Sequence, residues 1–563
     1  MARKRALDPL TESAGRVTGA VGAALADARM YARFGLGLRG YLGHRISLDE
    51  AAAVTRQRIQ DRESNFLRVV QRAIYGYPRS PYLPLLKLAG CELGDLRAMV
   101  SAKGLEGSLR ALRREGVYVS FEELKGRAPI VRQGRVIPAG PRAFDNPFLS
   151  HAFEAETGGS TGAGTRIEID LDHMADEALI SMLALDAHGV LRAPSAVWGG
   201  VLPDARPINL LLQGARMGSL PRRWFQPLPR EELRPALKHR LATRGIVGLA
   251  RRFGSPFPSP EPLRLDQADV IARWAAGTTR ANGACLVQVL VSMALRISIA
   301  AREAGLDLEG TTFTGGGEPP TPAKVREIER SGARWAPIYG IMEVGRVGEA
   351  CARPLDGNDV HFMRDHLALI QFPRQVPGTE LSVDAFQFTN LLPSSPKILL
   401  NAESDDYGIL ETRSCGCPLE SYGFSEHIRE VHSFRKLTGE GVTLVGGDMI
   451  RILEEVLPSR FGGSPLDYQI VEEEDERGLT RLSLFMSPRV EIADERQVIE
   501  AVLEALRRGS GAAVQAQAIW RQAQTLRVQR REPIWTARGK LMPLHLAQRA
   551  VSQASDPRAD RER

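Results

Sequence analysis

Four short stretches of this 563-residue chain combine residue types that could bind a nucleotide. The first is TGGSTGAGTR, in which four glycines and four hydroxyl residues fill the positions from Thr157 to Arg166. Glycine lets backbone N–H groups converge on an anion, and serine and threonine hydroxyls add further donors. A flexible linker would use the same letters, so this stretch alone leaves both interpretations open.

The other three stretches lie further along the chain. TGGGEP, from Thr314 to Pro319, ends a β-branched run and precedes a helical segment, and IYGIME, from Ile338 to Glu343, ends a second such run. PIWTARGK, from Pro533 to Lys540, lies near the C-terminus. Neither the G-x-x-x-x-G-K-[ST] phosphate loop nor the G-x-G-x-x-G dinucleotide fingerprint occurs in TGGSTGAGTR, so this stretch alone is weak evidence for a phosphate site.

In this order and coarse spacing, the four stretches resemble the adenylate-forming superfamily of acyl-CoA synthetases and ligases, most of all its phenylacetate–CoA ligase branch. The resemblance runs from about Leu88 to Ala550. It implies activation of a small carboxylic acid by ATP as an acyl-adenylate, with release of pyrophosphate. Transfer to a thiol and release of AMP would follow. The implied cofactors are ATP, Mg²⁺ and coenzyme A or phosphopantetheine, and a carrier protein is a candidate partner.

The resemblance also assigns roles residue by residue. The loop that grips the ATP phosphates corresponds to Thr157, Gly158, Gly159, Ser160, Thr161 and Gly162. The segment that packs against adenine corresponds to Gly315, Gly316, Gly317, Glu318 and Pro319, followed by Tyr339 and Gly340 beside the base. The remaining implied roles are the Mg²⁺ ligand Glu343, the ribose ligand Asp406, the hinge residue Arg435, the glycine beside pantetheine, Gly441, and the mobile lysine of adenylation, Lys540.

The chain departs from the pattern of these relatives at three places. The loop lysine is missing from Gly164-Thr165-Arg166, where Arg166 offers a charge of different geometry. Met342 stands where a threonine or serine precedes the acidic metal ligand, and the hinge at Arg435 lacks its glycine and paired aspartates. Two alternatives therefore stay open: a ligase whose acceptor is nitrogen, and a non-catalytic nucleotide-binding homologue.

A separate group of side chains could bind zinc. Cys415-Gly416-Cys417 is followed by His427 and His432, which together supply four soft or borderline ligands. The Cys-x-Cys spacing differs from the usual zinc knuckle, so a set of unligated residues is the alternative.

Composition narrows the class of protein. The net charge of +7 comes from 74 basic and 67 acidic residues without a compact basic strip, which argues against nucleic-acid binding. Five scattered cysteines do not make a disulfide framework, so a cytoplasmic location is expected. The sequence contains no long uncharged apolar run, so no transmembrane segment is expected. The oligomeric state stays open, a homodimer included.

The pattern of elements predicts an α/β fold: a large multilayer domain with mixed sheets and helices, and a small mobile α+β domain at the C-terminus. The expected divisions are a helical extension (1–80), an adenylation core (81–434), a small lid domain (435–550) and a disordered tail (551–563). Expected strands are GVYVSF, RIEIDL, GTTFTGG, WAPIYG and LALIQF.

Three helical expectations can be checked directly. Ser47 and Glu50 form a capping box that predicts a helix through Ile74. The segment from Arg16 to Leu42 mixes arginine with apolar residues, which suits a helix packed on the protein body or one lying on a membrane surface. The whole segment from Asn282 to Gly305 is expected to be helical.

Overall fold

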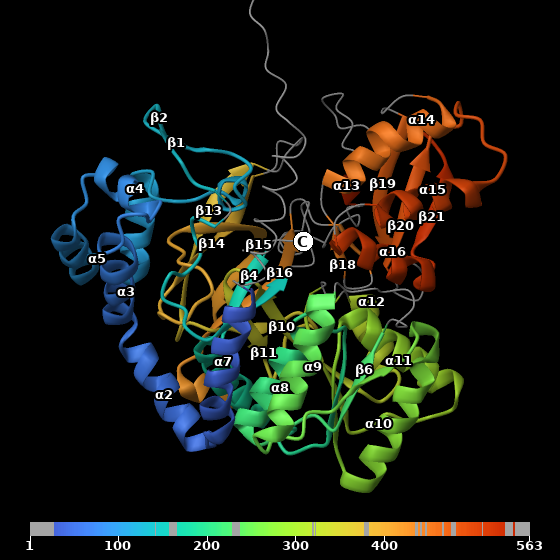
Figure 1. The fold of residues 1–563 in the computed structure, drawn as a ribbon, viewed down its shortest axis with the longest axis horizontal. Coiled ribbons are helices and arrows are strands. Elements are labelled where there is room, and N and C mark those ends of the chain that lie inside the picture. Colours follow the sequence, from blue (N-terminus) through green and yellow to red (C-terminus); the bar gives the residue numbers. More distant parts are fainter. Residues whose placement is uncertain are drawn as a thin grey trace, which may run out of the picture. The chain divides into compact units, whose positions relative to one another are not determined.

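The computed structural model describes residues 27–140, 142–156, 166–227, 237–317, 320, 322–375, 382–433, 437–439, 442–444, 447–463, 467–474, 480–508, 511–534 and 544–546. The chain forms two compact units, whose described residues fall within 27–433 and 437–546 (Figure 1). The first unit is a mixed α/β structure and includes the helices that precede residue 80. This agrees with the α/β class that the sequence predicts.

A twelve-stranded sheet organises the first unit, in the order β13-β14-β15-β16-β12-β11-β10-β9-β8-β5-β6-β7. Six neighbouring strands are parallel: β5 (Ser195–Trp198), β6 (Arg223–Gln226), β7 (Pro260–Pro262), β8 (Cys285–Gln288), β9 (Thr311–Gly315) and β10 (Arg334–Ile341). The other six pair antiparallel: β11 (Gly345–Ala350), β12 (Val360–Phe362), β13 (Leu367–Gln375), β14 (Ser382–Asn390), β15 (Ala402–Thr412) and β16 (Glu426–Ser433). Strand β10 is therefore the junction between a parallel half and an antiparallel half.

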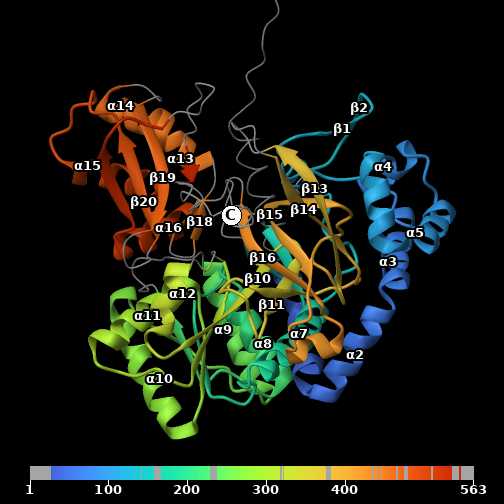
Figure 2. The same ribbon diagram turned by 180° about the vertical axis from the view of Figure 1, so that it is seen from behind.

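Helices cover the parallel half, as parallel strands require because their connections must cross over the sheet. These are α7 (Leu171–Ala187), α8 (Arg206–Met217), α9 (Leu237–Arg252), α10 (Ala268–Asn282), α11 (Val291–Glu303) and α12 (Pro322–Glu329), with the turn η2 (Leu265–Gln267). Figures 1 and 2 show α8 and α9 grouped apart from α10 and α11. The antiparallel half is contacted by α5 (Leu93–Arg114) and α6 (Phe121–Leu124).

Helix α2 (Leu48–Gln60) begins where the capping box predicts. Ser47 Oγ accepts a hydrogen bond from the backbone N–H of Glu50 at 3.1 Å, and the helix follows. The helical path is interrupted at Asp61 and continues as α3 (Arg62–Val70), η1 (Gln71–Tyr75) and, after a turn, α4 (Tyr82–Leu88). The prediction of a helix through residue 74 is thus confirmed, with one break.

The described part of the earlier segment, 27–43, is a helix packed on the protein body. Its buried side chains, Phe34, Leu38, Tyr41 and Leu42, join one apolar core with strands β3 (Ala152–Glu156) and β4 (Arg166–Asp170). Leu36 on the opposite side is 80% exposed. Of the two interpretations, the packed helix holds for these residues. None of the described helices is both long and apolar enough to span a membrane.

Two element predictions are wrong for identifiable reasons. The segment from Asn282 to Gly305 contains a fully buried strand, β8, before α11, and periodicity cannot separate a buried strand from a buried helix. The run GVYVSF forms only a bridge at Val119, because Ser120 accepts the N–H of Glu123 and starts helix α6 there. The strands predicted over RIEIDL, GTTFTGG, WAPIYG and LALIQF are confirmed as β4, β9, β10 and β13. A small hairpin, β1 (Ile130–Arg132) with β2 (Arg135–Ile137), follows α6.

The second unit is a small α+β structure. Its four-stranded sheet has the order β21-β20-β19-β22, from β19 (Tyr468–Glu474), β20 (Thr480–Met486), β21 (Leu526–Arg530) and β22 (Leu544–Leu546). Its helices are α13 (Gly447–Arg451), η4 (Ile452–Val456), α14 (Leu457–Phe461), α15 (Glu495–Arg507) and α16 (Gly511–Ala523), and β17 (Leu437–Gly439) pairs with β18 (Val442–Leu444).

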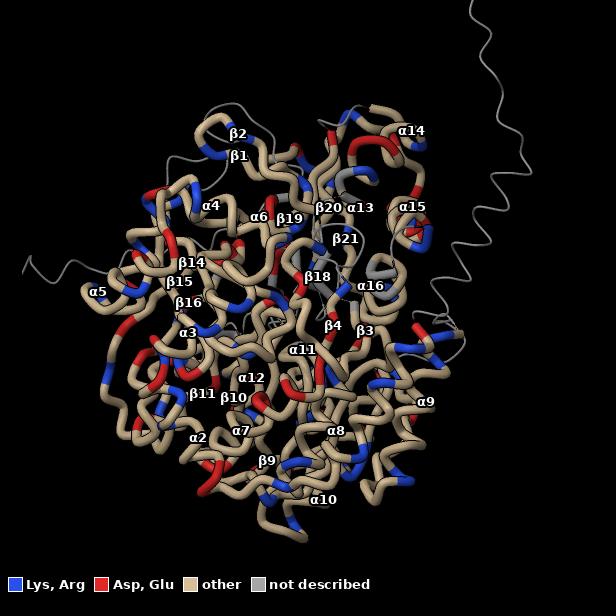
Figure 3. Tube along the Cα trace, turned by 60° about the vertical axis from the view of Figure 1, so that its left-hand side comes forward, with Lys and Arg blue, Asp and Glu red and all other residues tan. Residues whose placement is uncertain are grey.

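Charged residues of both signs alternate along the described chain (Figure 3). This pattern matches the diffuse excess of basic residues in the sequence, where 74 basic residues face 67 acidic ones.

Candidate active site

Two of the four predicted nucleotide-binding stretches lie at the carboxyl edge of the parallel strands. Gly315 closes β9, and Tyr339 and Glu343 lie at the end of the neighbouring strand β10 and in the turn that follows it. Because β9 and β10 are parallel, with Gly315 opposite Pro337, their ends meet at one edge. Open α/β sheets bind ligands at this edge, so the topology itself selects the segment.

The glycines that end β9 are required by close packing. A Cβ atom on Gly315 would overlap the carbonyl oxygen of Val289, and one on Gly316 would overlap that of Ile338. Gly317 has a φ of +91°, which side-chain-bearing residues rarely adopt. The same glycines therefore allow β9 to approach its neighbours and leave backbone uncovered at the edge of the sheet.

A hydrogen bond joins Tyr339 of strand β10 to Asp406 of strand β15. The Tyr339 hydroxyl donates a hydrogen bond to Asp406 Oδ2 at 2.8 Å, and Asp406 is 2% exposed on β15. Burial raises the pKa of Tyr339 well above its usual value, and the nearby negative charge of Asp406 adds to the effect. Tyr339 therefore stays protonated and acts as a hydrogen-bond donor.

The neighbouring carboxylate, Asp405, is directed elsewhere. It has a φ of +71° and pairs with Arg374, whose Nη1 lies 3.2 Å from Asp405 Oδ1. The same guanidinium also pairs with Glu403. Of the two adjacent aspartates, only Asp406 is hydrogen-bonded to the predicted base-stacking tyrosine.

Glu343 forms a buried ion pair that the sequence does not indicate. Its carboxylate contacts the ammonium of Lys125, and Glu343 is only 5% exposed. Burial alone would raise the pKa of Glu343, but the charge and hydrogen bond of Lys125 hold it below its ordinary value. The site thus contains a carboxylate whose ionised form is favoured, next to a lysine ammonium. Met342, one residue earlier, is 36% exposed in the turn.

A second ionic network lies immediately after the turn. Arg346 Nε donates to Glu177 Oε2 at 2.8 Å, its Nη1 pairs with Glu349, and its Nη2 lies 3.2 Å from Gln213 Oε1. All four side chains are buried. Because Glu177 belongs to α7 and Arg346 to β11, the network fixes the β10–β11 turn, and with it Glu343, against a helix.

Arg166 is engaged by two carboxylates at the start of β4. Its Nε lies 2.9 Å from Glu154 Oε2, and its Nη2 lies 3.2 Å from Glu168 Oε1. It also lines a cavity of about 470 Å³ together with Arg29, Arg33 and Arg142. Asp27 and Glu168 border the same cavity, so its lining carries both signs of charge.

Several predicted residues lie outside the described part of the chain. These are Thr157 to Gly162, Glu318, Pro319, Arg435, Gly441 and Lys540. Gly340, which is described, is exposed on β10 next to Tyr339. The structure therefore brings together Gly315 to Gly317, Tyr339, Gly340, Glu343 and Asp406 from the predicted set, and it adds Lys125.

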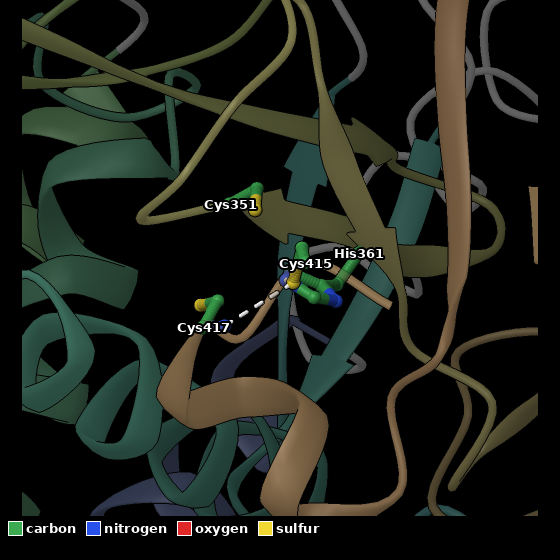
Figure 4. A group of neighbouring side chains, drawn as sticks. All are labelled: Cys351, His361, Cys415 and Cys417. Carbon is green, nitrogen blue, oxygen red and sulfur yellow. Dashed lines mark hydrogen bonds between the residues drawn. The ribbon is translucent and has the colours of Figure 1, made fainter. Parts of the chain in front are cut away.

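The predicted zinc ligands are distributed differently. Cys415 and Cys417 converge with Cys351 and His361, and one potential ligand atom from each residue lies within 4.8 Å of the others (Figure 4). His427 Nδ1 instead lies 2.7 Å from Asp359 Oδ1, and the His432 side chain lies outside the described residues. The set that the structure assembles thus shares two of its four members with the predicted set.

Sequence reasoning missed Lys125, Cys351 and His361. Lys125 meets Glu343 across 218 residues of sequence, and no local pattern marks such a contact. Cys351 and His361 could have been found by asking which cysteines and histidines lie in, or directly after, the strands next to Cys415. That question requires the strand order β16-β12-β11, which only the fold supplies.

Comparison with known proteins gives matches among solved structures only. No protein-family model and no curated protein sequence matches the chain. A 2-hydroxyisobutyryl-CoA ligase, solved with 2-HIB-AMP and CoA, is 15% identical with a TM-score of 0.49, and the match covers 87% of this chain and 90% of that one. The amide bond synthetase McbA from Marinactinospora thermotolerans is 13% identical with a TM-score of 0.38, over 82% and 92% of the two chains.

An acetoacetyl-CoA synthetase from Streptomyces lividans is 15% identical with a TM-score of 0.30, over 78% of this chain and 63% of that one. All three TM-scores are below 0.5, so no role is taken from these structures, and the assignment of roles rests on the residues described above. The phenylacetate–CoA ligase branch is not confirmed by these structures. The chain resembles the adenylate-forming superfamily in its motifs and is similar to CoA-ligase and amide-synthetase structures.

Proposed function

We propose that this chain is an ATP-dependent ligase that converts a carboxylic acid to an acyl-adenylate and then transfers the acyl group to a thiol of CoA or a carrier-protein pantetheine. The observation that carries the proposal is the grouping at the end of β10. There, Tyr339 of β10 is hydrogen-bonded to Asp406 of β15, and the buried, ionised Glu343 lies in the turn after β10, the strand next to the glycine end of β9.

The first role concerns the nucleoside. A carboxylate accepts hydrogen bonds from both hydroxyls of a ribose, and Asp406 is such an acceptor at the sheet edge. Tyr339 orients it through its hydroxyl and lies near the end of β10, the strand that pairs with β9. Gly316 and Gly317 leave the backbone uncovered, so a flat base can approach.

The second role concerns the phosphates. Mg²⁺ prefers carboxylate oxygens, and Glu343 fits this preference because its pKa is lowered and its carboxylate is ionised at neutral pH. When bound, Mg²⁺ neutralises phosphate charge. Lys125 supplies a cation beside the same carboxylate, in a chain whose glycine-rich loop lacks the lysine of its relatives.

The reaction then consists of two displacements. In the first, a carboxylate oxygen attacks the α-phosphorus, and the bond from that phosphorus to the pyrophosphate oxygen breaks. In the second, a thiolate sulfur attacks the acyl carbon, and AMP leaves with the bonding electrons. Such chemistry needs positioning and charge stabilisation more than covalent help. Lys540 is the proposed cation for the α-phosphate in the first step.

Isotope exchange between pyrophosphate and ATP tests the first half-reaction. Full-length protein with Mg²⁺ is given aryl, short-chain and long-chain acids one at a time, and exchange is expected with at least one class. Product mass spectrometry with CoA and with a simple amine added separately distinguishes a thioester from an amide. Amide formation without thioester would replace the thiol acceptor by nitrogen.

Lys540→Ala is expected to reduce exchange by about 100-fold or more while ATP binding, measured by calorimetry, changes little. Lys103→Ala, on the exposed face of α5, is the matched control and should exchange like the unmodified protein. ATP binding without exchange for any acid would favour the non-catalytic homologue.

A further inference from the structure

The cluster of Cys351, His361, Cys415 and Cys417 joins three segments of the first unit (Figure 4). Cys351 directly follows β11, His361 is the central residue of β12, and Cys415 and Cys417 lie between β15 and the turn η3 (Pro418–Tyr422). Three of the four residues are at most 3% exposed, and Cys415 is partly buried. The cluster uses three of the five cysteines in the chain.

The spacing of the ligand atoms suits one tetrahedral ion. Bond lengths of about 2.3 Å to sulfur and 2.0 Å to nitrogen place neighbouring ligand atoms about 3.5 to 3.8 Å apart around zinc. Cys415 Sγ lies 3.7 Å from His361 Nε2, and all four ligand atoms lie within 4.8 Å of one another. A small inward movement of side chains would close the shell.

The imidazole is in the tautomer that ligates metal. His361 Nδ1 lies 2.7 Å from the carbonyl oxygen of Phe424, and a carbonyl can only accept, so Nδ1 carries the hydrogen. In the neutral ring, Nε2 then presents its lone pair toward Cys415. Metal-ligating histidines are usually oriented by this hydrogen bond from the second ring nitrogen.

Backbone donors surround the sulfurs. The N–H of Ala352 lies 3.4 Å from Cys417 Sγ, that of Arg353 lies 3.4 Å from Cys351 Sγ, and that of Cys417 lies 3.3 Å from Cys415 Sγ. Hydrogen bonds to sulfur favour the thiolate, which is the form that binds metal.

The short loop between the two cysteines is shaped for this arrangement. Gly416 has a φ of +67°, and a Cβ atom there would lie 2.7 Å from Arg353 Nη1. The Glu420 carboxylate accepts the N–H groups of Cys415 at 3.0 Å and Gly416 at 2.7 Å. These contacts fix the turn, so the thiols of Cys415 and Cys417, which are separated by one residue, lie near the same point.

A competing set shares one sulfur with this cluster. Cys351, Asp359 and His427 also approach one another. However, Asp359 already pairs with Arg413 and with His427 Nδ1, so its charge is balanced within the protein. The ring of His427 contacts that of His361, with the ring centroids 4.1 Å apart, and so helps to fix the position of the His361 imidazole.

We propose that Cys351, His361, Cys415 and Cys417 bind one structural Zn²⁺ ion. With all four positions supplied by the protein, the site has no open position for substrate, which is the arrangement of a structural ion. The ion ties the end of β11 and the strand β12 to the loop after β15. Strand β11 also carries Arg346, and strand β15 also carries Asp406.

The metal content of the full-length protein, purified without added zinc and measured by plasma mass spectrometry, tests the proposal. About one equivalent of zinc per chain is expected. Less than about 0.2 equivalents, or iron in place of zinc, would overturn it. A disulfide between any two of the three cysteines in freshly prepared protein, detected by non-reducing peptide mass spectrometry, would also overturn it.

Substitutions locate the ion. Cys417→Ser and His361→Gln should each lower the zinc content severalfold, whereas Cys285→Ser should retain the full equivalent. Cys285 is the matched control because it is a fully buried thiol on β8 outside the cluster. Zinc retained in full by both ligand variants would place the ion elsewhere.

A measurement on the unmodified chain covers the case in which ligand variants fail to fold. Titration with an organic mercurial should release zinc to a chromogenic chelator in proportion to modification of three thiols. Release that does not follow thiol modification would contradict ligation by sulfur. In a cobalt-substituted sample, sulfur-to-cobalt charge-transfer absorption is expected together with the visible bands of a tetrahedral ion, and octahedral bands would contradict the four-ligand shell.

Discussion

Glu343 carries a negative charge where little water reaches it, and the ammonium of Lys125 keeps it ionised. Breaking such a pair from one side leaves a buried charge without a partner, which is costly. The pair therefore serves two purposes that can be separated experimentally. It stabilises the fold of the turn, and it maintains a carboxylate in the form that a metal or phosphate site requires.

Lys125→Met is expected to lower the free energy of unfolding by about 3 kcal/mol near pH 7. The lowered pKa of Glu343 contributes stability that is present above the unfolded-state pKa and is lost as pH falls through the folded-state pKa. Without Lys125, burial raises the pKa of Glu343 instead, so the penalty disappears in acid. Urea unfolding of the unmodified protein and of Lys125→Met measures this. The difference between their free energies of unfolding should become smaller from neutral pH toward about pH 4.

The double variant Lys125→Met with Glu343→Gln is the control for this measurement. It should recover much of the lost stability, because no unpaired charge remains. A stability difference that is independent of pH would contradict the assigned role of the ion pair.

The two adjacent aspartates should respond differently to the same change. Asp406→Asn is expected to raise the KM for ATP in the exchange reaction by about tenfold or more, since a charged acceptor for ribose hydroxyls is lost. Asp405→Asn should leave that KM nearly unchanged and lower the melting temperature, because it removes one of the two carboxylates that pair with Arg374. The opposite assignment of effects would move the nucleoside site to Asp405.

At the scale of elements, β9 and β10 show why glycine occurs where it does. Gly316 borders the carbonyl of Ile338, whereas a Cβ atom on Gly340 would meet its nearest neighbour, the oxygen of Gly345, at 3.6 Å. The first glycine is fixed by sheet packing and the second has room. A pattern of glycines in the sequence does not reveal this difference.

Gly316→Ala is expected to lower the free energy of unfolding by about 2 kcal/mol, because the added methyl group must displace backbone in a packed sheet. Gly340→Ala is the matched variant and should change stability little. Differential scanning calorimetry measures this: the melting temperature of the first unfolding transition is compared between the two variants. Equal melting temperatures for the two variants would contradict the packing argument.

The sequence predicts most elements that have a visible periodicity or cap. Ser47 identifies the start of α2, and the alternation in RIEIDL identifies β4. Strand β8 is missed because CLVQ is buried on both faces and reads like the helix that follows it. Side chains that meet through the fold, such as Lys125 with Glu343 or His361 with Cys415, leave no local signal at all.

On the scale of the whole molecule, the first unit gathers its predicted nucleotide residues where the sheet changes from parallel to antiparallel. β10 pairs in parallel with β9 on one side and antiparallel with β11 on the other. The predicted order of motifs along the chain thus becomes adjacency in space for Gly316, Tyr339, Glu343 and Asp406. The sequence indicates the order, and only the strand topology supplies the adjacency.

The far end of the same sheet has a consequence for how chains meet one another. Among the strands that the structure describes, β7, the sequence PEP, is the last of the sheet and pairs with β6 alone. Pro260 and Pro262 have no amide hydrogen, so this edge offers at most the single N–H of Glu261 to another strand. A sheet this wide would otherwise present a template for strand addition, and the two prolines protect crowded or newly made chains from joining edge to edge there.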